Sequence, residues 1–138
     1  MNRYVLDTEA LVWFLEKNPK LPKSVREDIE YMQYEYYISF LSLIEIDNLM
    51  KLGKIKLKYE LKDVIKQINE AYIGIYFGDI QILETLDDLE MKIIDNKTHS
   101  DYMDRSIIAT SIAYHHTLVS SDKKFPHYRN NGLSLLEI

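Results

Sequence analysis

Short apolar runs alternate along this chain with segments that repeat apolar residues at helical spacing, and this alternation limits the available folds more than any other feature. The runs rich in β-forming residues are residues 4–6, 36–40, 73–77, 117–120 and 133–136. Strand cores that are wholly apolar are typical of parallel strands covered on both faces. The sequence therefore predicts an α/β fold with three layers, α/β/α, around a central, mostly parallel sheet of about five strands.

The segments between these runs carry the usual signals of helix beginnings and ends. Helices are predicted around residues 11–15, over 23–34 and 43–52, around 61–68, from 80 toward 89 and over 102–116. Ser42 is predicted to cap the third of these helices, which Gly53 stops, and Asp79 to cap the fifth. The polar segment 95–100 is predicted to be a loop before the last helix. No linker or internal repeat divides the chain, so we expect residues 1–138 to form a single domain.

Several classes of protein are disfavoured by composition. The chain has no cysteine, so it has neither a disulfide framework nor a thiolate metal site. No apolar run approaches the roughly 20 residues that a membrane helix needs. Acids at Asp7 and Glu9 interrupt what would be the apolar region of a signal peptide. We therefore expect a cytoplasmic protein with no membrane association.

The formal net charge of −5 is unusual for a nucleic-acid binder, which is commonly basic. However, a nuclease that binds metal gathers carboxylates at its site, and bound divalent cations reverse the local charge. Positive charge is also clustered in one stretch of lysines: Lys51, Lys54, Lys56 and Lys58. That stretch is equally well interpreted as a solvated surface, so net charge does not decide the function.

Four acids stand where the predicted sheet would bring them together. Asp7 and Asp122 directly follow apolar strands, and ligands of open α/β sheets bind beyond the carboxyl ends of the strands. Glu45 lies in the first turn of the helix predicted after the second strand, and Asp104 in the first turn after the polar segment, so four acids from distant segments could converge on one spot. Oxygen ligands alone suit Mg²⁺ or Mn²⁺ rather than zinc. One or two such ions could activate water for attack on a phosphodiester.

Each acid also has a purely structural interpretation. Asp7 could cap the first helix, and Asp122 could lie in a turn. Glu45 stands three residues after Ser42, the spacing of a capping box. Asp101 could cap the last helix, and Asp104, in its first turn, could be there because the helix dipole stabilises a negative charge. Only the combination of four acids points to chemistry.

At these residues the sequence resembles the PIN-domain ribonucleases, and in particular the VapC-type toxins of type II toxin–antitoxin systems. The resemblance covers nearly the whole chain. Its motifs are Val5-Leu6-Asp7-Thr8, Ile38-Ser39 leading to Glu45, His99-Ser100-Asp101-Tyr102-Met103-Asp104-Arg105, and Leu118-Val119-Ser120-Ser121-Asp122. The sequence departs from that branch at Tyr102-Met103, which replace Pro-Phe, at Ser120, which replaces Thr, and at Glu9, where His is common. None of these changes removes one of the four acids.

The resemblance implies a three-layer PIN domain that cleaves RNA with Mg²⁺ or Mn²⁺. Its metal-binding and catalytic residues would be Asp7, Glu45, Asp104 and Asp122. Supporting roles would fall to Asp101, Thr8, Ser120 and Arg105: Asp101 as a further acid or helix cap, the two hydroxyls as hydrogen-bond partners of carboxylates or water, and the guanidinium as a partner of an acid or of phosphate. The partners would be an RNA substrate, a small antitoxin protein and a second copy of the chain in a homodimer.

Two other functions remain open at this point. A PIN nuclease with a housekeeping role in RNA processing would need no antitoxin. A PIN-like binding module would have no catalytic activity, although the complete set of acids argues against it.

Overall fold

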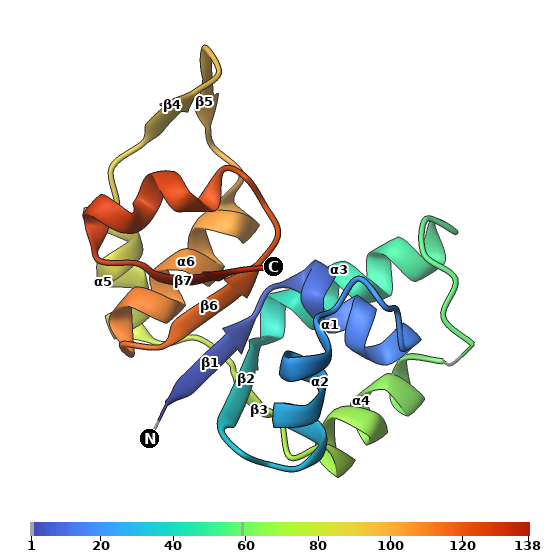
Figure 1. Ribbon diagram of the computed structural model, residues 1–138. Coiled ribbons are helices and arrows are strands. Elements are labelled where there is room, and N and C mark those ends of the chain that lie inside the picture. The colour runs from blue at the N-terminus through green and yellow to red at the C-terminus, as the bar shows by residue number, and fades with distance from the viewer. Residues whose placement is uncertain (1, 59) are drawn as a thin grey trace.

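The computed structural model describes residues 2–58 and 60–138 and has a five-stranded parallel sheet at its centre (Figure 1). The sheet order is β3-β2-β1-β6-β7. The strands are β1 (Arg3–Leu6), β2 (Glu35–Ser39), β3 (Gly74–Tyr76), β6 (Thr117–Ser120) and β7 (Ser134–Glu137). Every neighbouring pair in this sheet is parallel, which confirms the predicted α/β class and strand number.

Helices cover both faces of the sheet and make the three layers (Figure 1). On one face lie α1 (Thr8–Glu16), α2 (Lys23–Glu30), α3 (Phe40–Lys51) and α4 (Leu61–Glu70). On the other lie α5 (Ile80–Asp88), α6 (Tyr102–Ala113) and the 3-10 helix η1 (Phe125–Asn131), which the sequence did not predict. Adjacent strand residues point to opposite layers: Leu6 packs in the first core and Val5 in the second. Within the described residues, no helix is long and apolar enough to cross a membrane.

Three predicted helix boundaries are wrong. Helix α3 begins at Phe40 rather than at residue 43, because Ser39 is its N-cap and accepts a hydrogen bond from the Leu41 amide. Helix α2 ends at Glu30 rather than near residue 34, because Met32 takes a left-handed conformation with φ of 51°. Helix α6 ends at Ala113 rather than at residue 116, since the left-handed His115 turns the chain into β6.

Most of the polar segment predicted as a loop is instead part of a hairpin. Strands β4 (Lys92–Ile94) and β5 (Lys97–His99) pair antiparallel and project from the body of the molecule (Figure 1). The two residues between them, Asp95 and Asn96, both have positive φ, as a tight two-residue hairpin turn requires. Aspartate and asparagine tolerate this conformation better than most residues, which explains why a polar pair can reverse the chain here.

Candidate active site

The order in which the chain adds strands to the sheet reverses at β1, which makes this strand the topological switch point. From β1 the chain adds β2 and then β3 on one side, and later crosses to add β6 and β7 on the other. The segments that follow β1 and β6 therefore separate at the carboxyl edge, which leaves room for a ligand. Asp7 follows β1, and Asp122 lies two residues beyond β6.

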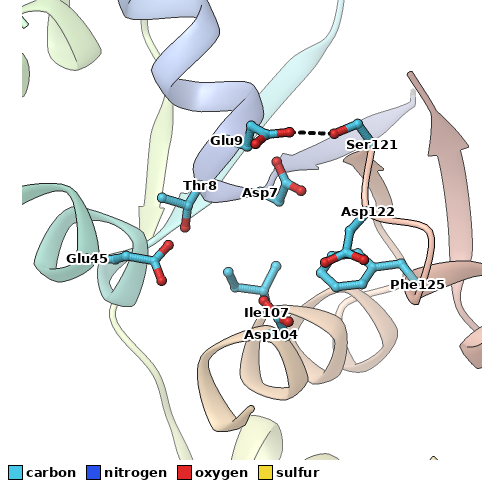
Figure 2. Close-up of a pocket in the computed structure, with 9 residues that line it drawn as sticks. All are labelled: Asp7, Thr8, Glu9, Glu45, Asp104, Ile107, Ser121, Asp122 and Phe125. Atoms are coloured by element: carbon cyan, nitrogen blue, oxygen red, sulfur yellow. Dashed lines mark hydrogen bonds between the residues drawn. The ribbon is translucent and has the colours of Figure 1, made fainter. Parts of the chain in front are cut away.

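A pocket of about 320 Å³ occupies this position and is named here the acid pocket (Figure 2). Its lining residues are Asp7, Thr8, Glu9, Glu45, Asp104, Ile107, Ser121, Asp122 and Phe125. All four acids singled out from the sequence are among them. They come from the N-cap of α1, from α3, from α6 and from the segment after β6, so the fold brings together acids up to 115 positions apart.

Asp7 combines a structural role with a place in the pocket. One carboxylate oxygen caps α1 by accepting from the Ala10 amide at 2.8 Å, and the other accepts from the Ser120 hydroxyl at 2.5 Å. Burial raises the pKa of Asp7 to about 6, although these two hydrogen bonds oppose the shift. The negative charges of Glu9 and Asp122 raise it further.

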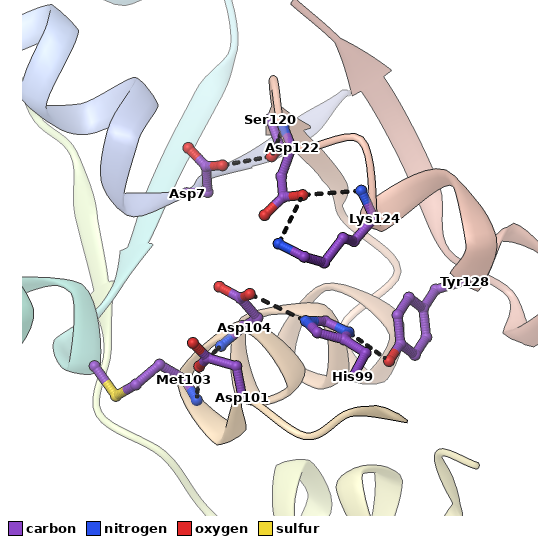
Figure 3. A network of polar contacts seen from close by, with 9 residues as sticks. All are labelled: Asp7, His99, Asp101, Met103, Asp104, Ser120, Asp122, Lys124 and Tyr128. Atoms are coloured by element: carbon purple, nitrogen blue, oxygen red, sulfur yellow. Dashed lines mark hydrogen bonds and ion pairs between the residues drawn. The ribbon is translucent and has the colours of Figure 1, made fainter. Parts of the chain in front are cut away.

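Asp104 ends a buried chain of polar side chains (Figure 3). His99 Nε2 lies 3.1 Å from the Asp104 carboxylate, and His99 Nδ1 lies 2.8 Å from the Tyr128 hydroxyl. A neutral imidazole satisfies both contacts by donating from Nε2 and accepting at Nδ1. Burial raises the pKa of Asp104, and the hydrogen bond from His99 opposes that rise.

The capping-box interpretation of Glu45 is wrong. Ser39 rather than Ser42 caps α3, so Glu45 lies in the second turn of the helix, where the backbone amides are already paired. The Ser42 hydroxyl is buried and accepts a hydrogen bond from Thr8 at 3.0 Å. Among the described residues, no side chain or amide holds the Glu45 carboxylate, which lines the acid pocket.

Asp122 fits both of its interpretations. Its carboxylate accepts from the Lys124 amide at 2.8 Å, as in a turn, and lies 3.8 Å from the Lys124 ammonium. The same side chain lines the acid pocket. Ser120 links it to Asp7, because the Ser120 hydroxyl accepts from the Asp122 amide while donating to the Asp7 carboxylate.

Three of the predicted supporting residues, Asp101, Arg105 and Ser120, lie outside the pocket lining, whereas Thr8 is part of it. Asp101 is the N-cap of α6 and accepts from the amides of Met103 and Asp104 at 2.9 and 3.1 Å. Arg105 is buried, and its guanidinium donates to the carbonyls of Leu89 and Glu90 at 2.6 and 3.1 Å. It holds the end of α5 rather than an acid side chain.

Glu9 and Ser121 line the pocket although the sequence did not suggest a role for them. The Ser121 hydroxyl donates to the Glu9 carboxylate at 2.6 Å and so joins α1 to the segment after β6 (Figure 2). The available signal was spacing: Glu9 follows Asp7 in the first turn of α1, and Ser121 precedes Asp122. Ile107 and Phe125 add an apolar surface to the pocket.

The oxygen donors of the acid pocket suit a hard divalent cation, and no nitrogen or sulfur ligand lines it. In the described part of the chain, however, no three such side chains are close enough to hold one ion. Burial of Asp7 and Asp104 with raised pKa values is what a site lacking a counter-charge produces. The chemistry of the donor set therefore fits such a cation, and Glu45 is the acid of the four whose carboxylate has no hydrogen bond or ion pair with a described residue.

Comparison with known proteins gives one family and one fold. The sequence model of the PIN domain matches residues 4–131. No curated protein matches the chain significantly in sequence.

Among solved structures, a chain of VapBC2 from Rickettsia felis, bound to a DNA fragment from its promoter, is similar with a TM-score of 0.68 and 21% identity. The match covers 98% of each chain. VapBC-1 from nontypeable Haemophilus influenzae gives 0.57 and 18%, covering 98% of this chain and 97% of the other. FitAcB from Neisseria gonorrhoeae gives 0.55 and 16%, covering 97% and 96%. At these identities the likeness concerns the fold.

Proposed function

Because the chain belongs to the PIN domain family, a family of nucleases, we propose that it is a metal-dependent endoribonuclease that hydrolyses RNA phosphodiester bonds at the acid pocket. The observation that carries the proposal is the meeting of Asp7, Glu45, Asp104 and Asp122, from four separate segments, around one pocket at the switch point of the sheet. Single acids often cap helices or end turns, but four that converge on one open pocket, with only Asp122 near a lysine ammonium among the described residues, favour a ligand that supplies positive charge.

The four acids are the residues that would hold Mg²⁺ or Mn²⁺, as one or two ions. When bound, such a cation supplies charge that offsets the phosphodiester oxygens and makes water more acidic. Ser120 and the Ala10 amide orient the Asp7 carboxylate, and His99 orients that of Asp104. Ile107 and Phe125 give the pocket an apolar wall beside the carboxylates.

The test compares two neighbouring aspartates of the same helix. Asp104→Asn should abolish RNA cleavage in Mg²⁺, because it removes a charged ligand. Asp101→Asn is the matched control and should retain most activity, since asparagine caps helices well and Asp101 lies outside the pocket lining. Equal cleavage by wild type and Asp104→Asn would refute the proposed site.

The biological role proposed is that of a VapC-type toxin in the cytoplasm, paired with a small antitoxin and assembled as a homodimer. The support is the fold, which is shared over nearly the whole chain with components of VapBC complexes. Expression of the protein alone should then arrest growth, and co-expression of the small protein encoded beside it should relieve the arrest. Harmless expression of active enzyme would favour the housekeeping RNA-processing role instead.

A further inference from the structure

We propose that one base of the RNA strand leaving the acid pocket stacks on Trp13, in a second hollow that adjoins the first. The proposal rests on the proposed function, because it places the nucleotides that flank the scissile phosphate. It assigns a binding subsite for a nucleobase, with an adjacent lysine segment that takes the phosphates.

The second hollow, named here the tryptophan hollow, has a volume of about 400 Å³. It is lined by Thr8, Glu9, Val12, Trp13, Glu16, Glu45, Leu49 and Ile55. Three of these, Thr8, Glu9 and Glu45, also line the acid pocket. The two hollows therefore adjoin along these residues, and a polymer held in the first would pass over one of the surfaces beside it.

The face of α1 that joins the hollows sets the distance between them. Glu9 and Trp13 are four residues apart on the helix and so lie on the same face. Four residues of an α-helix rise about 6 Å along the axis. A nucleotide next to the phosphate in the acid pocket can thus bring its base to the indole.

The lining of the tryptophan hollow suits an uncharged aromatic ring better than a phosphate. Trp13 is half-buried against the core, and the part of its indole that lines the hollow is a surface on which a base can stack. Leu49 and Ile55 add aliphatic walls. The carboxylates of Glu16 and Glu45 at the same hollow repel phosphate. The RNA backbone must therefore lie outside the hollow, on a surface of opposite charge.

The lysine segment (Lys51, Lys54, Lys56 and Lys58) provides that surface. Lys54 and Lys56 flank Ile55, which lines the hollow, and both are exposed. Lys51 is paired with Asp47 at 2.8 Å, whereas Lys54, Lys56 and Lys58 form no ion pair with any described residue. A further cation lies at the indole itself, where the Lys20 ammonium is 5.9 Å from the ring centroid. This charge complements a nucleic-acid backbone, and it decides between RNA and an apolar protein segment as the occupant.

Intrinsic fluorescence tests the stacking directly, because Trp13 is the only tryptophan in the chain. Asp104→Asn is mixed with a short single-stranded RNA, so that binding is followed without cleavage. Saturating RNA should quench the fluorescence, since a base covers the indole. The same oligonucleotide with abasic sugars should bind with little quenching. Unchanged fluorescence, when anisotropy of a labelled RNA shows that it is bound, would overturn the proposal.

Affinity measurements with variants give a second, independent readout. Trp13→Leu should weaken RNA binding by roughly 5- to 150-fold, the range for loss of one base stack, and Trp13→Phe should restore most of it. The matched control is Tyr31→Leu, an aromatic that is 67% exposed and outside both hollows. Equal loss in Trp13→Leu and Tyr31→Leu would contradict the assignment.

The lysine segment has its own signature in the salt dependence of binding. Replacing both Lys54 and Lys56 by glutamine should reduce the slope of log affinity against log salt by about 0.7 for each phosphate that these lysines neutralise in the wild type. The same double change at Lys62 and Lys66 on α4 is the control and should leave the slope unchanged. An unchanged slope in the variant of Lys54 and Lys56 would show that the RNA phosphates do not contact these lysines and would contradict this part of the proposal.

These outcomes separate this proposal from the proposed function. Quenching by RNA together with failure of wild type to cleave RNA in Mg²⁺ would preserve the subsite and refute the nuclease. Cleavage of RNA without quenching of the tryptophan fluorescence would support the nuclease and refute the base subsite at Trp13. If Trp13→Leu binds and cleaves RNA like wild type but no longer responds to an inhibitory protein partner, the hollow is a protein-binding site and the proposal is wrong.

Discussion

Burial governs the protonation of Asp7 more than any single neighbour does. The residue is only 6% exposed, and loss of solvation is the largest cause of its pKa of about 6. Hydrogen bonds from Ser120 and Ala10 recover part of that loss, while Glu9 and Asp122 add repulsion. An ionised Asp7 therefore destabilises the metal-free protein, and a cation in the acid pocket would relieve it.

The first prediction concerns the pH dependence of stability without metal. The pKa of Asp7 in the folded protein is above its ordinary value of 3.8, so the folded state binds more protons between the two values. Stability from this group is present below about pH 4 and is lost as pH rises through 6. Asp7→Asn in EDTA should therefore match wild type near pH 4 and exceed it at neutral pH, by up to about 3 kcal/mol. Urea unfolding across this range measures the difference, and a difference independent of pH would contradict the account.

His99 contacts Asp104 and lies outside the lining of the acid pocket. The imidazole is buried, and its two nitrogens are occupied by Asp104 and Tyr128. It therefore positions a carboxylate, as partners behind metal ligands commonly do. The Tyr128 hydroxyl in turn fixes the orientation of the ring.

The second prediction follows from that chain. Tyr128→Phe should weaken Mn²⁺ binding by roughly 10-fold, because His99 loses the partner that orients it. Tyr36→Phe is the matched control, since it removes another tyrosine hydroxyl bonded to a carboxylate, that of Asp28, away from the acid pocket. Calorimetric titration well below the melting temperature measures both. If the two variants lose similar stability and both bind Mn²⁺ like wild type, Tyr128 has only a structural role.

At the scale of elements, the start of α3 decides what Glu45 can do. With Ser39 as the cap, the first turn is complete before Glu45 is reached, and the side chain is free to face the acid pocket. Ser42 is then available inside the protein, where it joins α3 to α1 through Thr8. A shift of three residues in one helix start therefore changes Glu45 from a cap into a candidate ligand.

The third prediction tests that start. Ser39→Ala should lower the free energy of unfolding by about 1 kcal/mol, because the Leu41 amide loses its acceptor. Ser39→Thr keeps the hydroxyl and should recover much of the loss. Chemical unfolding of the three proteins measures it, and equal stability of Ser39→Ala and wild type would mean that another group caps α3.

The elements that sequence predicted well are those with one dominant signal. The buried strands and the helix caps depend on local patterns. Both Asp79 and Asp101 accept hydrogen bonds from backbone amides in the first turn of their helices, as expected of caps. The start of α3 was missed because Ser39 and Ser42 are equally good caps by sequence, and the hydrogen bond from Thr8 to Ser42 distinguishes them. The role of Arg105 was also missed because it depends on a contact distant in sequence: its carbonyl partners, Leu89 and Glu90, directly follow α5.

At the scale of the whole molecule, sheet order creates the site. Asp7 and Asp122 could be expected at one edge because each follows a strand, and the parallel pairing of β1 with β6 brings those strands side by side. The places of Glu9 and Ser121 depend on how α1 meets the segment after β6, which no local pattern describes. The net charge of −5 is then partly a property of the site, because five carboxylates line one pocket.

Melting curves with and without Mn²⁺ test most directly whether Asp7, Glu45, Asp104 and Asp122 bind a divalent cation. Metal that binds only the folded protein should stabilise wild type by about 2.7 kcal/mol at a hundredfold excess over Kd. Asp104→Asn should melt at or above wild type in EDTA, because a half-buried carboxylate with a raised pKa is replaced by a neutral amide, yet gain far less from Mn²⁺. The Asp101→Asn control should gain as much as wild type. Equal Mn²⁺-induced shifts in wild type and Asp104→Asn would contradict the claim.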